Sequence, residues 1–184
     1  MSRQPHFKPR LPRIWMFSDE RLGASFLPAL AQLPKGAGLV FRHYQLELCE
    51  RRALFVRARR IARARRIVIV LAGSDQLASA WRADGSHGRA PHPSRGLRTA
   101  PVHNLRELVA AERAGADLLF ISPVFVTRSH PGSQPLGRRG FAALANGTKI
   151  PAVALGGMTP RRARMLKYAY GWAGIDSWLP ARTD

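Results

Sequence analysis

Cysteine, acidic residues and long apolar runs are all scarce in this sequence of 184 residues. The single Cys49 excludes an intrachain disulfide and leaves no pattern for a zinc site. No run approaches the roughly 20 apolar residues of a membrane-spanning helix, so we expect no membrane partner. The N-terminus is basic but lacks an apolar segment followed by small residues, which argues against a secretory signal and predicts a cytoplasmic protein.

The scarcity of acidic residues leaves the chain strongly basic. Thirty Lys and Arg against eleven Asp and Glu give a formal net charge of +19. Only four of the basic residues are lysine, and the arginines are spread over most of the chain, as GC-rich coding produces. A basic protein attracts polyanions, but no nucleic-acid-binding motif accompanies this charge. We therefore expect no specific nucleic-acid partner, and a polyanion-binding protein is the least favoured interpretation.

Short apolar runs alternate with helical segments, which is typical of proteins built on a parallel sheet. We expect strands at residues 13–19, 39–44, 66–73, 83–88, 97–103, 117–125, 150–157 and 174–178. The main helices are expected at residues 26–33, 46–65, 75–82, 104 onward, around 141–145 and 159–170. Eight strands, seven helices and no helix after the last strand predict a trimmed TIM (β/α)₈ barrel. A doubly wound open sheet is the competing topology, because periodicity does not distinguish the two.

The whole chain reads as one domain, because its 46% hydrophobic content suffices for a single core. We expect the barrel at residues 13–178, a basic N-terminal extension at 1–12 and a short tail at 179–184. A barrel without its last helix leaves apolar surface uncovered, so we expect a homodimer.

The active site of a (β/α)₈ barrel forms at the carboxyl ends of its strands. The sequence IPAVALGGMTP predicts a buried strand that delivers two glycines onto a helix N-terminus. Glycines let the backbone approach an anion, so the N–H groups of Gly156, Gly157 and Met158 are candidates for binding phosphate. A tight turn with ordinary helix caps would share this pattern. Ser177 could add an N–H or a hydroxyl, although Asp176 beside it would repel phosphate if it faced inward.

Two long segments carry a resemblance to a known family. PVHNLRELVAAERAGADLLFISPVFVTRSHPGSQPLGRRG resembles the segment after the fifth strand in TenI and thiamine phosphate synthase proteins, and IPAVALGGMTPRRARMLKYAYGWAGI resembles their phosphate-binding strand and helix. ADGSHGR is a weaker match to the family's ADGVHLGQ, and FSDER to its ITD segment. The resemblance to this superfamily implies a phosphorylated thiazole ligand and a (β/α)₈ barrel.

Thiamine phosphate synthase uses Mg²⁺, and the resemblance shows what this chain lacks for it. The family carries an Asn-Asp pair at the end of the third strand, where this sequence has Ala72 and Gly73. The family's second acidic ligand falls near Pro91. Because Mg²⁺ prefers carboxylate oxygens, these changes argue against Mg²⁺-pyrophosphate chemistry. Asp75 or Asp84 could substitute only if the loops were rearranged.

The TenI branch suits the remaining residues better. Its thiazole tautomerases move a proton on a carboxythiazole phosphate without a metal, and use the histidine of a Ser-Val-His-Ser motif as acid and base. The matching stretch here is Pro-Val-His-Asn, so the resemblance assigns that role to His103. Imidazole suits it because it titrates near neutral pH. The next helix begins at Asn104, and Glu107 three residues on predicts a capping box.

Four residues are candidates for binding the rest of the substrate. Arg42 could pair with a substrate carboxylate through two hydrogen bonds, or form an ion pair at the barrel mouth. His43 could face the site instead, because adjacent strand residues point to opposite sides. Thr127 and Ser129, after the sixth strand, could bind substrate or order their loop.

The leading hypothesis is a TenI-like isomerase of thiamine biosynthesis that acts on a thiazole phosphate without metal or cofactor. The alternative is thiamine phosphate synthase, a Mg²⁺-dependent transferase that joins a pyrimidine diphosphate to a thiazole phosphate. A third hypothesis is a degenerate barrel that binds a phosphorylated ligand without catalysis.

Overall fold

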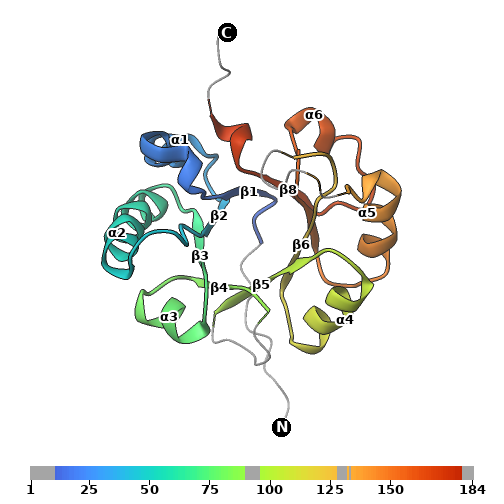
Figure 1. Cartoon of the computed structure of the whole chain (residues 1–184), viewed down its shortest axis with the longest axis horizontal. Helices are drawn as coiled ribbons and strands as arrows, with labels where there is room; N and C mark the ends of the chain where they lie inside the picture. The colour runs from blue at the N-terminus through green and yellow to red at the C-terminus, as the bar shows by residue number, and fades with distance from the viewer. Residues whose placement is uncertain (1–10, 90–95, 128–131, 133, 180–184) are drawn as a thin grey trace.

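The computed structural model describes residues 11–89, 96–127, 132 and 134–179. Eight parallel strands pair in sequence order, and β8 pairs with β1 to close the barrel (Figure 1). The strands are β1 (Ile14–Phe17), β2 (Gly38–Phe41), β3 (Val68–Ala72), β4 (Gly85–His87), β5 (Leu97–Val102), β6 (Leu118–Ile121), β7 (Ala152–Ala154) and β8 (Gly171–Gly174). The closed order confirms the (β/α)₈ barrel and is incompatible with a doubly wound open sheet.

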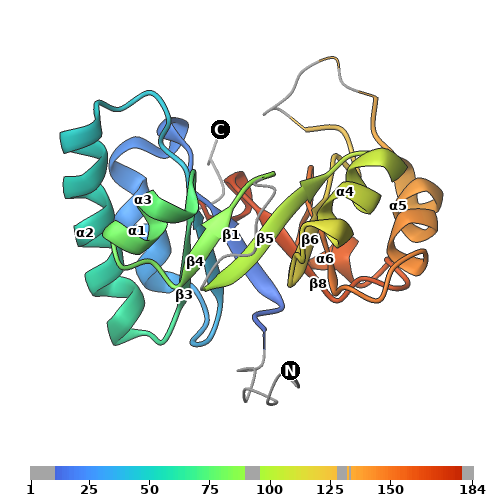
Figure 2. The same ribbon diagram turned by 90° about the horizontal axis from the view of Figure 1, so that it is seen from below.

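Helices surround the barrel on its outside (Figure 2). The described residues form six α-helices, one at each of the six ranges named above and one fewer than the count of seven: α1 (Phe26–Gln32), α2 (Leu48–Ala64), α3 (Asp75–Ala80), α4 (Leu105–Arg113), α5 (Gly137–Asn146) and α6 (Pro160–Ala163). Two short 3₁₀ helices, η1 (Glu20–Ser25) and η2 (Asp176–Trp178), follow β1 and β8. From β8 to Leu179, η2 is the one helical segment. None of the helices in the described ranges is long and apolar enough to cross a membrane.

Two expected elements at the end of the chain were wrong. The expected helix at 159–170 is only the four residues of α6, and the eighth strand is shifted from 174–178 to β8. The backbone N–H of Trp172 donates to the carbonyl of Arg13, and that of Tyr170 donates to the carbonyl of Ala152 in β7, so the strand begins early. Gly171 permits this, because a Cβ there would lie 2.6 Å from the carbonyl carbon of Arg13. The helix must therefore end early to let the chain turn.

Aromatic side chains fill the inside of the barrel below its mouth. The rings of Trp15 and Phe17 lie edge-on to Phe120, with centroids 5.3 and 4.8 Å apart, and His87 lies 5.5 Å from the same ring. Burial lowers the pKa of His87 to about 3, so this imidazole is neutral, and its Nδ1 lies 2.9 Å from the Thr99 hydroxyl. This aromatic layer forms a floor under the carboxyl ends of the strands. The domain limits stay a prediction, because 1–10 and 180–184 lie outside the described residues.

Candidate active site

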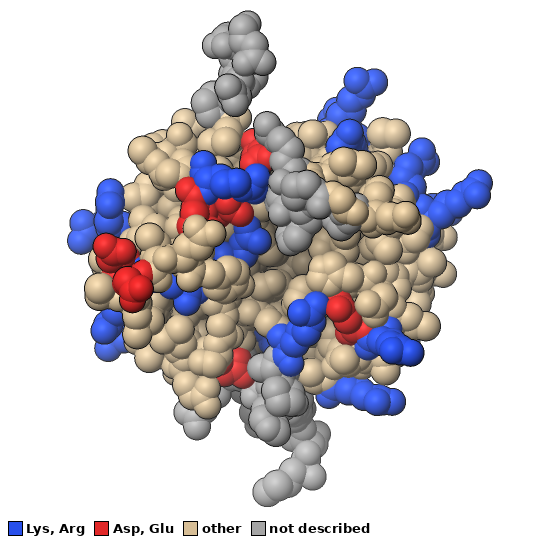
Figure 3. Space-filling model, viewed as in Figure 1, with Lys and Arg blue, Asp and Glu red and all other residues tan. Residues whose placement is uncertain are grey.

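A cavity of about 400 Å³ opens where the strands end. Figure 3 shows this end of the barrel, with a hollow near the centre of the visible face. Seven residues expected from the sequence line the cavity: Arg42, His103, Thr127, Gly156, Gly157, Met158 and Ser177. The structure therefore brings together the predicted acid/base, the predicted carboxylate ligand and the predicted phosphate loop.

Two other candidates from the sequence, His43 and Ser129, are not among the described residues that line this cavity. His43 is buried outside it, where its Nδ1 lies 2.9 Å from the Ser18 hydroxyl and its ring stacks on Phe41 at 5.0 Å. Its φ of 46° shows that the alternation of the strand has already ended there, so the choice between Arg42 and His43 goes to Arg42. Ser129 lies outside the described residues.

The glycine loop after β7 has the geometry of an anion cradle. Gly156 and Gly157 have φ of 93° and 60°, a conformation that favours glycine. A Cβ on Gly156 would lie 2.7 Å from the Cα of Pro123, so the loop packs closely against the segment after β6. The N–H groups of Gly156, Gly157 and Met158 have no acceptor within the described ranges. Three backbone donors are thus available at the cavity wall.

Arg162 adds a positive charge to this loop and was missed by the sequence analysis. Its side chain lines the cavity, donates from Nη1 to the carbonyl of Gly157, and lies 4.8 Å from the Phe125 ring centroid. The residue lies in the first turn of α6, where its N–H donates to the capping hydroxyl of Thr159. Because α6 is so short, we assign the positive potential here to Arg162 and not to a helix dipole. Its position three residues after the predicted N-cap Thr159 could have indicated that Arg162 lies at the phosphate loop.

The opposite side of the phosphate loop is closed by η2. The Ser177 hydroxyl donates to the carbonyl of Met158, which ties η2 to the loop and commits that hydrogen. Asp176 does line the cavity, and its carboxylate lies 3.9 Å from the guanidinium of Arg21. Asp176 therefore faces the site, the orientation in which it would repel phosphate, and Arg21 beside it offsets part of its negative charge.

Arg42 is held rigidly at the mouth. Its Nε donates to the carbonyl of Ser18 at 2.8 Å, and its Nη2 lies 2.6 Å from the Asp19 carboxylate. The side chain both forms the ion pair and lines the cavity, so the two alternatives from the sequence coexist. Its Nη1 makes no hydrogen bond to any described residue and is available to a ligand.

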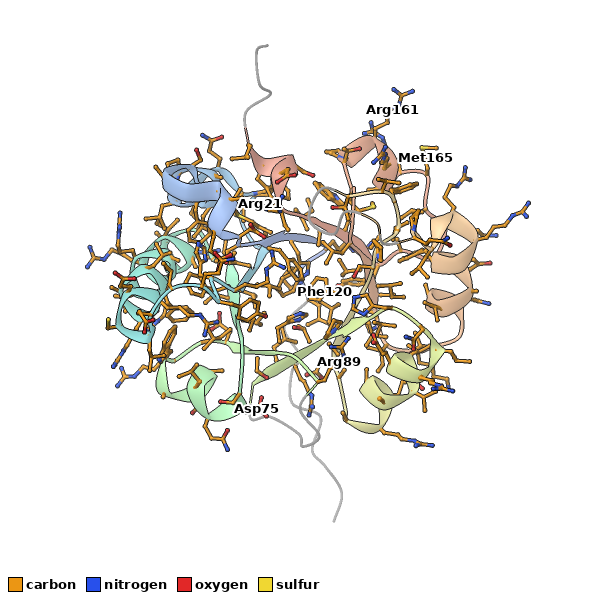
Figure 4. All side chains as sticks on the ribbon, in the orientation of Figure 1. Arg21, Asp75, Arg89, Phe120, Arg161 and Met165 are labelled. Atoms are coloured by element: carbon orange, nitrogen blue, oxygen red, sulfur yellow. The ribbon has the colours of Figure 1, made fainter. Side chains whose placement is uncertain are left out.

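His103, just past the end of β5, is part of a charged cluster. Its Nδ1 lies 2.7 Å from a carboxylate oxygen of Glu107, and Arg89 donates to the other oxygen at 2.9 Å. Burial raises the pKa of the Glu107 carboxyl, but hydrogen bonds from His103 and Arg89 outweigh it and hold the pKa below its usual value. Glu107 and Arg89 were not predicted as site residues, although the capping-box pattern placed Glu107 at the start of α4. In Figure 4, Arg89 lies beside the barrel centre marked by Phe120.

The fold and this cavity define a (β/α)₈ barrel with a ligand site at the carboxyl ends of its strands. The family model described as thiamine monophosphate synthase matches residues 18–177. The chain therefore belongs to the thiamine phosphate synthase/TenI family, a family of enzymes of thiamine biosynthesis.

Individual relatives agree with this assignment. A putative thiamine-phosphate synthase 2 of Aquifex aeolicus is 32% identical over 183 residues, covering 92% of this chain and 98% of that protein. The thiamine-phosphate synthase of Chloroflexus aurantiacus is 40% identical over 63 residues, or 34% of this chain and 29% of that protein. The solved thiamine phosphate pyrophosphorylase of Pyrococcus furiosus superposes with a TM-score of 0.77 at 26% identity, covering 90% of this chain and 86% of that one.

The residues around β3 do not fit the Mg²⁺ that the synthase resemblance implies. Ala72 and Gly73 occupy the end of β3, and neither side chain offers a ligand. Asp75 accepts a hydrogen bond from Ser86, which lies on the outward side of β4 because its neighbour His87 points into the barrel. Figure 4 accordingly places Asp75 at the periphery of the molecule.

The second acidic residue considered as a substitute lies even further away. The Asp84 carboxylate accepts from the N–H of Ile69 at 2.8 Å, near the start of β3 and therefore at the opposite end of the barrel. In the part of the chain that the structure describes, no three His, Cys, Asp or Glu side chains form a group that could hold a metal ion. Residues 90–95, beside the position of the family's second acid, contain no acidic residue.

Proposed function

We propose that this protein is a TenI-like isomerase that transfers a proton on a carboxylated thiazole phosphate without a metal or cofactor. The observation that carries the proposal is the position of His103. It lines the same cavity as the glycine loop, while the family's acidic pair at the end of β3 is absent and Asp75 and Asp84 are engaged elsewhere. A homodimer in the cytoplasm remains our expectation and belongs to the same proposal.

Each end of the cavity matches one charged group of such a substrate. The phosphate would accept hydrogen bonds from the N–H groups of Gly156, Gly157 and Met158, with Arg162 balancing its charge. The carboxylate would pair with the free Nη1 of Arg42. With its phosphate and its carboxylate both bound, the substrate would have its ring fixed between them, which orients the ring for proton transfer.

His103 would carry out the chemistry on the bound ring. Its Nε2 takes a proton from a ring carbon as the C–H bond breaks, and the electron pair moves into the ring. The imidazolium then returns the proton to another atom of the ring system, which becomes aromatic. The substrate and product are isomers, so no oxidant, reductant or second substrate is consumed.

The proposal is tested with the thiazole carboxylate phosphate tautomer in the presence of a chelator, comparing wild type with His103→Ala. We expect conversion by wild type and a drop of at least about a hundredfold in the variant, the scale of general acid–base catalysis. Failure of the folded wild type to convert this substrate would contradict the proposal. Retained binding of the thiazole phosphate would then identify a non-catalytic barrel.

Thiamine phosphate synthase is the second candidate, favoured by the names of the relatives. It predicts release of pyrophosphate from a pyrimidine diphosphate only when the thiazole phosphate and Mg²⁺ are both present. We expect no such release, because no three His, Cys, Asp or Glu side chains among the described residues form a group that could hold the metal. Mg²⁺-dependent release that His103→Ala leaves intact would favour the synthase.

A further inference from the structure

Glu107 contacts His103 at two points through one carboxylate oxygen. Oε2 lies 2.8 Å from the backbone nitrogen of His103 and 2.7 Å from Nδ1 of its ring. The N-cap of α4 holds Glu107 in place, because the side-chain oxygen Oδ1 of Asn104 accepts a hydrogen bond from the backbone N–H of Glu107 at 3.0 Å. The imidazole is therefore fixed in orientation relative to the end of β5.

The charge state of Glu107 decides which ring nitrogen carries the proton. Arg89 Nη2 lies 2.9 Å from the other oxygen, and the lowered pKa of Glu107 keeps it ionised near neutral pH. An ionised carboxylate can only accept hydrogen bonds. The guanidinium of Arg89 also lies 3.3 Å from His103 Nδ1, but the Glu107 oxygen is closer, at 2.7 Å. We therefore place the ring hydrogen on Nδ1, where it is donated to Glu107, and leave the lone pair on Nε2.

Nε2 is the ring nitrogen left for the substrate. No hydrogen bond to it comes from any residue of the described ranges, whereas His103 lines the cavity. An imidazole without such a partner favours a proton on Nε2, which would leave no lone pair on the reacting side. A partner on Nδ1 thus changes a poor base into a usable one.

We propose that Glu107 is the positioning residue of this site, with Arg89 supporting it. This inference rests on the proposed function and deepens it. Glu107 holds the Nδ1–H tautomer of His103, directs the free Nε2 to the cavity, and stabilises the imidazolium that forms when Nε2 takes the substrate proton. The proton returns to the substrate from Nε2, so Glu107 is not itself protonated.

The alternative role for Glu107 is that of a helix cap alone. A cap needs only the contact with the backbone N–H of His103. The second contact to the ring and the bridge to Arg89, which lies beyond β4, are not required for capping. Glu112 on the same helix is the matched control, because it accepts from the Thr148 hydroxyl at 2.6 Å and does not line the cavity.

The first experiment reads the tautomer directly, by ¹⁵N NMR of the His103 side chain in the intact protein without substrate. We expect the Nδ1–H form in wild type and in Glu112→Gln, and a shift to the Nε2–H form in Glu107→Ala. Glu107→Gln should retain much of the Nδ1–H form, because its amide oxygen is still drawn to the backbone N–H of His103. An unchanged tautomer in a folded Glu107→Ala would overturn the proposal, whatever the activity.

The second experiment measures turnover of the thiazole carboxylate phosphate by the same variants. We expect Glu107→Ala to lower kcat by about 10- to 100-fold with little change in KM, the usual effect of removing an orienting partner, and Glu107→Gln to lie between it and wild type. Glu112→Gln should match wild type. In a His103→Ala background, Glu107→Ala should cause no further loss, and an additional loss would contradict action through His103.

The two experiments separate the two proposals. If the wild type converts no substrate but Glu107→Ala still shifts the His103 tautomer as expected, the isomerase is contradicted and the positioning role of Glu107 stands. If Glu107→Ala fails to fold, Glu107→Gln and Arg89→Gln carry the test. Identical tautomers and identical kcat in wild type and both of these variants would then overturn the positioning role.

Discussion

The guanidinium of Arg42 is clamped by Asp19 through a contact of 2.6 Å between Nη2 and Oδ2. Burial raises the pKa of the Asp19 carboxyl, but hydrogen bonds from Arg21 and the charges of Arg42 and Arg21 lower it below its usual value. The pair therefore stays charged near neutral pH. It fixes an arginine at the cavity with Nη1 unused, which is the geometry expected of a carboxylate receptor.

Replacing Arg42 should weaken binding of the carboxylate and spare binding of the phosphate. We expect Arg42→Gln to lower affinity for the thiazole carboxylate phosphate by about 10- to 100-fold, the value of a hydrogen bond between charged groups. Calorimetric titration with this ligand and with the same thiazole phosphate lacking the carboxylate measures the effect. Arg60→Gln, on the exposed side of α2, is the control. Equal losses for both ligands would show that Arg42 does not bind the carboxylate.

Arg162 should account for much of the affinity for phosphate. Arg162→Gln removes the charge from the glycine loop, and we expect binding of a thiazole phosphate to weaken by about tenfold or more. Arg161→Gln is a matched control on α6, because the Arg161 side chain extends away from the barrel in Figure 4. Equal effects of the two variants, lost together at high salt, would indicate general attraction by a basic surface instead.

Much of this site was predictable because its residues lie at or directly after the ends of strands that the sequence indicates. Gly156 and Gly157 stand directly after an apolar run, and His103 stands at the end of the strand expected at 97–103, so both were placed at the mouth from the sequence. β8 was misplaced because GWAG contains two glycines and has neither apolar length nor alternation. Its existence depends on pairing with β1 and β7, which no local pattern records.

The side chains that act on other side chains were harder to find. Glu107 was correctly placed at the start of a helix, but its contact with the His103 ring depends on how β5 enters α4. Arg89 reaches the same carboxylate from beyond β4, a neighbour in space and not in sequence. Such partners follow from the closed barrel, and the sequence alone indicates the separate elements only.

Gly157→Ala should damage both stability and phosphate binding. With φ of 60°, any side chain is strained there, and the added Cβ would lie 3.0 Å from Cβ of Phe125 and collide with the carbonyl of Val126. Gly115→Ala is the control, since Gly115 has φ of 73° but nothing within 4 Å of its added Cβ. We expect Gly115→Ala to cost about 1–2 kcal/mol of unfolding free energy and Gly157→Ala more. Only Gly157→Ala should also reduce phosphate affinity, and two variants with equal affinity would contradict the cradle.

His87 should make the folded protein sensitive to acid. Histidine in an unfolded chain titrates near 6.5, whereas burial lowers the pKa of His87 to about 3 in the folded protein. Between these values the unfolded state binds a proton that the folded state does not. Stability is therefore fully present above pH 6.5 and falls as the pH drops toward 3, by up to about 1.4 kcal/mol per pH unit.

The contribution of His87 can be separated from that of the carboxyl groups by substitution. His87→Gln keeps a polar group near Thr99 but does not titrate, so its unfolding free energy should change less between pH 7 and pH 5. We expect the wild type to lose about 2 kcal/mol more than the variant over this range, measured by urea denaturation. Carboxyl groups such as Asp19 affect both proteins equally and cancel in the difference. Parallel losses in the two proteins would mean that water or a rearranged core lets the imidazole protonate inside the barrel.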